Sequence, residues 1–376
     1  MQHPIIYLDN NATTRTDDRV VQAMLPFFTS EYANSGSAHL FGLSANEAVD
    51  DARLQVAEFI NSKPNEIVFT SGATEAINLV LKGFPNQNRK HIVTVNSEHK
   101  GVLDTCRFLE SDFDVTYLNV DEKGEISLGQ LENAITENTF LVSVMFANNE
   151  IGNLNPIKEM VKIAREKGAL FMTDATQAVG KIPVDVKDLD VDFLVFSAHK
   201  FYGPKGIGAL YISSDNKKKP HALIHGGGQQ RNRRSGTLNV PGIVAMGKAC
   251  EIAQSEMGGN AVHIGKLRDM LEKGLLEIDG AFVNGTIENR LFNTTNICFP
   301  GIDSDKLILQ LQNIAVSNGS ACSAVSTEPS HVLKAIGLSD ENALASIRFS
   351  LGKYNTSREI DTTIERVKIL VSELRK

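Results

Sequence analysis

The 376-residue sequence has few cysteines and none of the paired cysteine motifs that form disulfide frameworks or metal clusters. Its four cysteines, Cys106, Cys250, Cys298 and Cys322, include no CxxC pair, which disfavours structural disulfides and a structural zinc site. No run of about 18 apolar residues is present, so a transmembrane helix is not expected. The first residues lack the basic and then apolar pattern of a secretion signal, so we expect a cytoplasmic protein that does not bind membranes.

Motifs of several common ligand sites are also missing. The chain contains no GxGxxG fingerprint, no Walker lysine and no GxSxG nucleophile motif, which argues against a nicotinamide dehydrogenase, a P-loop site and an esterase. His221 and His225 have a metal-like i, i+4 spacing, but no HExxH glutamate lies between them, and we expect no metal. The net charge of −7 disfavours nucleic-acid binding; the basic run 231–236 suits a small anion better.

The pattern that is present is an alternation of short β-branched runs and amphipathic stretches. Strands are expected in 66–70, 91–95, 113–120, 139–146, 169–175 and 191–198, with helices between them, including 75–84, 127–135 and one from Pro156. This alternation predicts an α/β fold with a mostly parallel, covered sheet. In such folds the ligand site lies beyond the carboxyl ends of the strands.

The C-terminal third has a different pattern. Helices are expected at 242–257, 262–276 and near 304–313, strand-like runs at 294–300 and 347–352, and a last amphipathic helix from about 357. We therefore predict a large domain of residues 15–254 and a smaller α+β domain of residues 1–14 and 255–376.

Lys200 is the first candidate for chemistry. It follows an apolar strand in "FSAHKFYGPKGIGALYI", between His199 and a glycine-rich turn. A partly desolvated amine there would have a lowered pKa and could form a Schiff base with a carbonyl. Lys205 is the competing lysine, but it lies beyond Gly203 and Pro204, so Lys200 is favoured.

Two further segments place polar groups after expected strands. "TSGATEAIN" (70–78) opens a helix whose free N–H groups and Thr74 hydroxyl would suit a phosphate, although an ordinary capped helix start reads the same way. "FMTDATQAVGK" ends a strand with Asp174, a carboxylate that could hold a protonated ring nitrogen, with Gln177 three residues on; a simple turn is the alternative. An imine-forming lysine, a phosphate cradle and a ring-nitrogen partner together are what pyridoxal phosphate requires.

Cys322 differs from the other cysteines in its surroundings. It lies in "VSNGSACSAVSTEP", a run of small and polar residues that predicts a mobile loop. A thiol in such a loop can ionise and can move with the loop. In contrast, Cys250 and Cys298 have the setting of core residues, and Cys106 falls in an expected helix. Cys322 is therefore the candidate reactive thiol.

Taken in order and spacing, these motifs resemble the class V aminotransferase-like enzymes, and most closely the cysteine desulfurases of the group that includes bacterial sulfur donors for iron–sulfur clusters. The resemblance spans nearly the whole chain. It rests on "YLDNNATT", "TSGATEAIN", "SEHKGVLDTC", "NNEIG", "DATQAVGK", "SAHKFYGPKGIGAL", "RRSGT", "SNGSACSA" and "IRFSLG". It implies the fold of the pyridoxal-phosphate-dependent transferases that resemble aspartate aminotransferase.

The resemblance also implies roles for individual residues. Lys200 would hold pyridoxal phosphate, Asp174 would pair with the ring nitrogen, and Gln177 and Asn149 would lie at the ring hydroxyl. Ala73, Thr74, Ser197 and His199 would bind the phosphate, and Thr237 would reach the phosphate of a neighbouring subunit in a homodimer with shared sites. His99 would stack on the ring and exchange protons, although a lone histidine at a helix start is more often structural.

For the substrate, the resemblance implies L-cysteine. Arg348, which could otherwise form a buried ion pair, would clamp its carboxylate, with Asn11 and Asn149 nearby. Cys322 would accept the sulfur as a persulfide, leaving L-alanine, and the sulfur would pass to an acceptor protein for iron–sulfur cluster assembly or another pathway. The alternatives are a selenocysteine lyase, another aminotransferase of this class, and a noncatalytic sulfur-binding scaffold.

Overall fold

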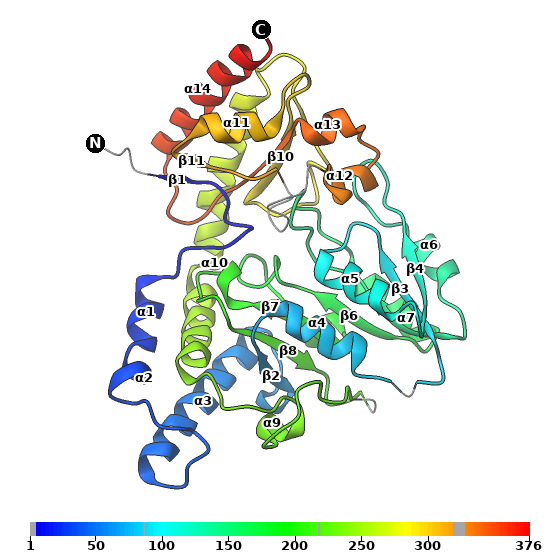
Figure 1. Cartoon of the computed structure of the whole chain (residues 1–376), viewed down its shortest axis with the longest axis vertical. Coiled ribbons are helices and arrows are strands. Elements are labelled where there is room, and N and C mark those ends of the chain that lie inside the picture. Colours follow the sequence, from blue (N-terminus) through cyan, green and yellow to red (C-terminus); the bar gives the residue numbers. More distant parts are fainter. Residues whose placement is uncertain (1–4, 86, 217–218, 319–327) are drawn as a thin grey trace.

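The structure is a computed structural model that describes residues 5–85, 87–216, 219–318 and 328–376. The largest sheet has seven strands in the order β2-β8-β7-β6-β5-β3-β4 (Figure 1). Its strands are β2 (Ile67–Thr70), β3 (His91–Val95), β4 (Asp114–Leu118), β5 (Thr139–Ser143), β6 (Leu170–Asp174), β7 (Phe193–Ser197) and β8 (Gly208–Ile212). Each of the six strands expected in this region is present.

The sheet is mostly parallel, as the alternation predicted. Strands β4, β3, β5, β6 and β7 pair in parallel, whereas β8 runs antiparallel to both β7 and β2. Residues 198–207 connect β7 to β8 without a crossover helix, and β8 therefore returns in the opposite direction. The residues of "IGALYI" do not reveal this reversal. The carboxyl ends of β2, β6 and β7 consequently lie at the same edge of the sheet.

Helices cover both faces of this sheet. In β2, Ile67 and Phe69 contribute to one hydrophobic core and Val68 to the other, because successive strand residues point to opposite faces. One face is covered by α4 (Ala73–Lys82) and α5 (Lys100–Leu109). The other is covered by α3 (Leu40–Phe59), α6 (Leu128–Ala134), α7 (Ile157–Glu166), α8 (Val186–Leu189) and the first half of α10 (Val240–Leu275).

The remaining α-helices and strands lie before, between and after these. They are β1 (Ile6–Tyr7), α1 (Asp18–Met24), α2 (Pro26–Thr29), α9 (Gln229–Asn232), β9 (Phe282–Val283), β10 (Thr294–Cys298), α11 (Ser304–Leu311), β11 (Ile314–Ala315), α12 (His331–Ala335), α13 (Asp340–Leu344), β12 (Ser346–Ser350) and α14 (Ser357–Leu374). A three-stranded sheet has the order β12-β10-β9, and β1 pairs with β11. Strand β1 and the C-terminal helix α14 lie at the end of the molecule that carries these small sheets (Figure 1).

Helix α10 contributes residues to two separate hydrophobic cores. The two helices expected at 242–257 and 262–276 are one continuous helix of 36 residues, which passes through Gly258 and Gly259 without a break. Packing at both ends maintains the helix across this glycine pair, despite its low helix propensity. The predicted domain boundary near residue 255 falls inside α10. A separate hydrophobic core does join Ile6 and Leu8 to residues from α10, α11 and α14, and the division of the chain into two domains stays a prediction.

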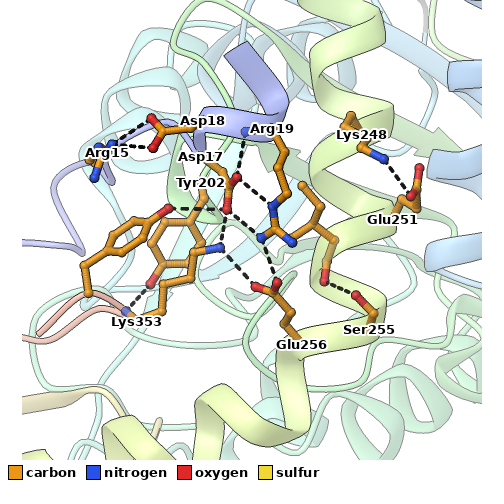
Figure 2. A network of polar contacts seen from close by, with 12 residues as sticks. Arg15, Asp17, Asp18, Arg19, Tyr202, Lys248, Glu251, Ser255, Glu256 and Lys353 are labelled. Carbon is orange, nitrogen blue, oxygen red and sulfur yellow. Dashed lines mark hydrogen bonds and ion pairs between the residues drawn. The ribbon is translucent and has the colours of Figure 1, made fainter. Parts of the chain in front are cut away.

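A polar network ties the N-terminal segment to α10 and to the residues after β12 (Figure 2). Lys353 Nζ lies 2.5 Å from Asp17 Oδ2 and 3.1 Å from Glu256 Oε2. The Tyr202 hydroxyl accepts a hydrogen bond of 2.7 Å from the main-chain N–H of Lys353. Because Tyr202 belongs to the turn after Lys200, this network also fixes one side of the candidate site.

No helix among the described residues is both long and apolar enough to span a bilayer.

Candidate active site

A cavity of about 290 Å³ lies at the edge of the sheet where β2, β6 and β7 end. Most of the residues singled out from the sequence line this one cavity. They are Asn11, Ala73, Thr74, His99, Asn149, Asp174, Gln177, Ser197, His199, Lys200 and Arg348. Thr237 is exposed and does not line it. Cys322 lies outside the described residues.

One end of the cavity is formed by the start of α4. The main-chain N–H of Ala73 donates to Ser197 Oγ at 2.8 Å, which joins the helix start to the end of β7. Gly208 allows this approach, because a Cβ there would lie 2.6 Å from the Cα of Gly72. The N–H groups of a helix start carry partial positive charge, so this end of the cavity suits an anion such as a phosphate.

His199 lies beside that end. Its Nδ1 is 3.1 Å from Thr13 Oγ1. Burial, followed by the positive charges of Lys200, Lys205 and Lys181, lowers the pKa of His199 to about 4. The imidazole is therefore neutral at pH 7, with one ring nitrogen as a donor and the other as an acceptor.

Lys200 ends the short 3₁₀ turn Ala198–Lys200 that continues β7. Its half-buried Nζ donates to the main-chain carbonyls of Asn11 at 2.6 Å and Ala12 at 2.7 Å. Lys205, the competing lysine, is exposed and lines a different hollow. Only Lys200 of these two lysines places its amine in the cavity.

Asp174 is the last residue of β6, and its Oδ1 accepts from the main-chain N–H of Thr176 at 2.9 Å. Gln177 follows in the next turn and donates from Nε2 to the carbonyl of Asn11 at 3.0 Å. Both side chains are buried, with 6% and 4% of their surface exposed. A carboxylate and an amide thus lie in the same wall as Lys200.

His99 caps the N-terminus of α5. Its Nδ1 accepts a hydrogen bond of 3.0 Å from the main-chain N–H of Gly101, so the proton of the neutral ring is on Nε2. The preceding residue, Glu98, is fully buried and accepts a hydrogen bond from the N–H of Met145. Burial and, secondarily, the charge of Asp174 raise the pKa of the Glu98 carboxyl well above its usual range. Glu98 was not singled out from the sequence, although it stands in the quoted motif "SEHKGVLDTC".

Arg348 reaches the cavity from β12. Its Nη2 forms an ion pair of 2.6 Å with Asp9 Oδ1, and Nη1 donates to the carbonyl of Asn149 at 3.0 Å. The sequence left two alternatives for Arg348, a structural ion pair or a carboxylate clamp. The ion pair is present, and Arg348 also faces the cavity.

Several buried polar atoms of the cavity wall suit a polar ligand. Within the part of the chain that the structure describes, Asn149 Oδ1, Thr176 Oγ1 and Arg348 Nε have no hydrogen-bond partner. Such buried groups are costly unless a ligand or water satisfies them. Together with Lys200, Asp174 and the start of α4, they fit a charged, ring-containing molecule with a phosphate, as pyridoxal phosphate is.

The sequence did not identify every wall residue. Ala12, Ile77, Met145, Ala147 and Thr176 also line the cavity. Ala12 and Thr176 adjoin residues that were singled out, so proximity in the motifs could have indicated them. Ile77, Met145 and Ala147 are apolar residues whose position depends on packing.

A family model for class V aminotransferases matches residues 6–363. The chain therefore belongs to the class V aminotransferase family, whose members depend on pyridoxal phosphate.

Among its relatives are proteins named cysteine desulfurase IscS. That of Glaesserella parasuis serovar 5 is 50% identical over 99% of this chain and 94% of its own length. That of Pasteurella multocida is 49% identical over 99% of this chain and 94% of its own.

Solved structures show the same fold. A NifS-like protein, 42% identical, superposes with a TM-score of 0.93 over 98% of this chain and all of its own. A structure described as SspA in complex with cysteine is 38% identical, with a TM-score of 0.82 over 93% of this chain and all of its own.

Proposed function

We propose that this protein is a pyridoxal-phosphate-dependent cysteine desulfurase that converts L-cysteine to L-alanine and transfers the sulfur to Cys322. The observation that carries the proposal is the convergence of Lys200, Asp174, His99 and Arg348 on one cavity at the carboxyl ends of the strands. The likeness to proteins named cysteine desulfurase, at 50% identity over 99% of this chain, supports the choice of reaction.

In this proposal each part of the cofactor has its own partners in the cavity. Lys200 would hold its aldehyde carbon, and Asp174 would hold the ring nitrogen in its protonated form. The start of α4, with Ala73, Thr74, Ser197 and His199, would bind the phosphate. Gln177 and Asn149 would face the ring hydroxyl. When bound, pyridoxal phosphate supplies an electron sink for the carbon that loses a proton.

The substrate would be bound through its carboxylate by Arg348, with Asn11 and Asn149 beside it. Lys200 would take the proton from the Cα atom, and His99 would supply a proton from Nε2. The Cys322 thiolate would attack the substrate sulfur, so that an S–S bond forms while the Cβ–S bond breaks. The electron pair of the broken bond takes up one proton and gives the methyl group of alanine, so the reaction needs no external oxidant or reductant.

Partners follow from the same proposal. Thr237 is exposed in a segment that the Arg234–Glu75 ion pair of 2.9 Å holds close to the start of α4. We propose that Thr237 contacts the phosphate in the site of a second copy, in a homodimer. The persulfide would then pass to an acceptor protein in the cytoplasm, for iron–sulfur cluster assembly or another sulfur pathway.

The test is alanine release from L-cysteine by the purified, cofactor-loaded protein with a reductant present. The wild-type protein should release alanine, and Cys322→Ala should lose this activity. Cys250→Ala is the matched control, because Cys250 is buried in the core, and this variant should keep the activity.

Other outcomes separate the alternatives. Alanine release by Cys322→Ala would contradict sulfur transfer to that thiol. Activity on selenocysteine alone would favour a lyase, and keto-acid formation from other amino acids would favour an aminotransferase. If the wild-type protein does not bind pyridoxal phosphate, the noncatalytic sulfur-binding scaffold is the alternative that is favoured.

A further inference from the structure

Lys181 is a buried lysine behind the wall of the cavity. Only 8% of its surface is exposed. Its Nζ donates to Gln177 Oε1 at 2.5 Å and to Asn11 Oδ1 at 3.2 Å. No carboxylate among the described residues forms an ion pair with it. Burying an amine that only amide oxygens contact costs free energy. Its presence here therefore calls for a functional explanation.

The local chain brings Lys181 to this position. Gly180 has a φ of +82°, and a Cβ there would lie 2.3 Å from the Cβ of Phe201, the residue after Lys200. The turn therefore packs closely against the Lys200 segment, which a residue with a side chain could not do. Lys181 and Lys200 also line one small cavity of about 20 Å³.

Asn11 joins the two lysines. Its main-chain carbonyl accepts from Lys200 Nζ at 2.6 Å and from Gln177 Nε2 at 3.0 Å. Its side-chain Oδ1 accepts from Lys181, while Nδ2 donates to the carbonyl of Asn149 at 3.1 Å. Two of the residues assigned to ligand binding, Asn11 and Gln177, therefore share Lys181 as a partner.

These contacts define which way each amide faces. A side-chain amide has an oxygen that only accepts and a nitrogen that only donates, and the two ends have nearly the same shape. The Asn11 carbonyl only accepts, so Gln177 must turn its nitrogen toward it and its oxygen toward Lys181. In the same way, Asn11 turns its oxygen toward Lys181 because its nitrogen faces the Asn149 carbonyl.

We propose that Lys181 is a positioning residue, which together with the Asn11 carbonyl holds the amide of Gln177 so that its N–H groups, and not its oxygen, face the Lys200 side of the cavity. The inference rests on the proposed function only in taking Gln177 as a contact of the cofactor. Burial, followed by the charges of Lys200 and Arg348, lowers the pKa of Lys181 well below its usual range. A neutral amine still has two N–H groups, enough for the two oxygens that it contacts.

The consequence concerns the oxygen on the cofactor ring. An oxygen that carries negative charge is stabilised by N–H donors and destabilised by a facing carbonyl. Without Lys181, the Gln177 oxygen would be buried without its donor, and the side chain would rotate away from the fixed orientation. Lys181 thus acts on the cofactor through Gln177 without touching it.

The experiment compares Lys181→Met and Lys181→Arg as purified holoenzymes. Methionine has a similar shape and no N–H group, whereas arginine keeps donors and can extend into the adjoining cavity. We expect Lys181→Met to weaken pyridoxal phosphate binding by about tenfold, as expected for one lost buried hydrogen bond, and to shift the absorbance band of the bound cofactor. Lys181→Arg should keep both the binding of pyridoxal phosphate and the position of the band close to those of the wild-type protein.

A double-mutant cycle tests the route through Gln177. In the Gln177→Ala background, Lys181→Met should have no further effect on the cofactor band or on the dissociation constant. Arg53→Met is the control for losing a buried cation elsewhere, because Arg53 donates to the carbonyl of Ile67 at the start of β2, away from the strand ends that carry the cavity. It should lower stability but leave the band unchanged.

An equal band shift in both backgrounds, or an unshifted band in Lys181→Met, would overturn the inference. If Lys181→Met does not fold, Lys181→Ala decides instead, because it also removes the N–H groups: its band should shift, and that of Lys181→Arg should not. These readouts need only bound cofactor. A wild-type protein that binds pyridoxal phosphate but releases no alanine would contradict the proposed function and leave this test valid.

Discussion

Arg348 Nη2 lies 2.6 Å from Asp9 Oδ1, with 3% and 17% of the two side chains exposed. The residue assigned to the substrate carboxylate therefore already has an anionic partner. Asp9 compensates the guanidinium charge in the absence of substrate, because an unpaired buried charge would be costly. We therefore expect this carboxylate to compete with the substrate carboxylate for Arg348.

This competition predicts the effect of Asp9→Asn. The variant should lower the KM for L-cysteine several-fold, because Arg348 no longer exchanges one carboxylate for another. It should also lower the free energy of unfolding by about 1–3 kcal/mol, because a buried charge loses its partner. Steady-state kinetics and urea unfolding measure the two effects. An increase in KM would show instead that Asp9 orients Arg348 for the substrate.

Substitution of Lys200 and of Lys205 should have very different effects on activity. Lys200→Ala should lower kcat by about 10³-fold or more, as expected when the covalent anchor and the proposed base are removed together. Lys205→Ala should keep activity near the wild-type level, because Lys205 is exposed outside the cavity. Alanine release and the absorbance of bound cofactor check both variants. Full activity in Lys200→Ala would remove the basis of the site assignment.

His199 should make stability depend on pH. Its pKa of about 4 in the folded protein is below the value of about 6.5 in an unfolded chain. The unfolded chain therefore binds more protons between these values, and this histidine lowers stability as pH falls from about 6.5 to about 4. Urea unfolding of the cofactor-free protein at pH 7.5 and pH 5 measures the change.

The control for that effect is His199→Gln, which cannot titrate. Its loss of stability between pH 7.5 and pH 5 should be smaller than that of the wild-type protein. An identical loss in both proteins would mean that other groups account for the pH dependence.

Lys353 should contribute strongly to stability. Its side chain is 7% exposed and that of Asp17 is 5% exposed, so Lys353→Met leaves a buried carboxylate without one of its cations (Figure 2). We expect the free energy of unfolding to fall by about 3 kcal/mol. The matched control is Lys248→Met, because Lys248 and Glu251 form a more exposed pair, and its effect should be within about 1 kcal/mol. Equal effects would contradict the importance of burial.

Most of the sheet could be predicted from the sequence because its signals are local. Residues 91–95 alternate between the two cores of a parallel sheet, and β3 occupies that range. The side chains of Asp174 and Lys200 follow apolar strands, and strand ends of a parallel sheet meet at one edge. The predictions that Cys250 and Cys298 are core residues and that Cys106 lies in a helix are confirmed. Cys322 as sulfur acceptor stays a prediction.

Other features depended on residues far apart in the chain. The sequence alone did not indicate that Asp9 meets Arg348, that Asn11 contacts both Lys181 and Lys200, or that β8 runs antiparallel. It also did not show that one helix continues through Gly258 and Gly259. Each of these depends on packing between distant segments, which no local pattern records.

The amino-acid sequence by itself thus determined six strands of the large sheet with helices between them, the reactive residue types and the strand ends that carry them. Only the tertiary structure decided which charged groups are buried together and how the amides of Asn11 and Gln177 face. The physical reason is that periodicity and turn chemistry act between near neighbours, whereas desolvation and hydrogen-bond pairing depend on whatever the fold brings into contact.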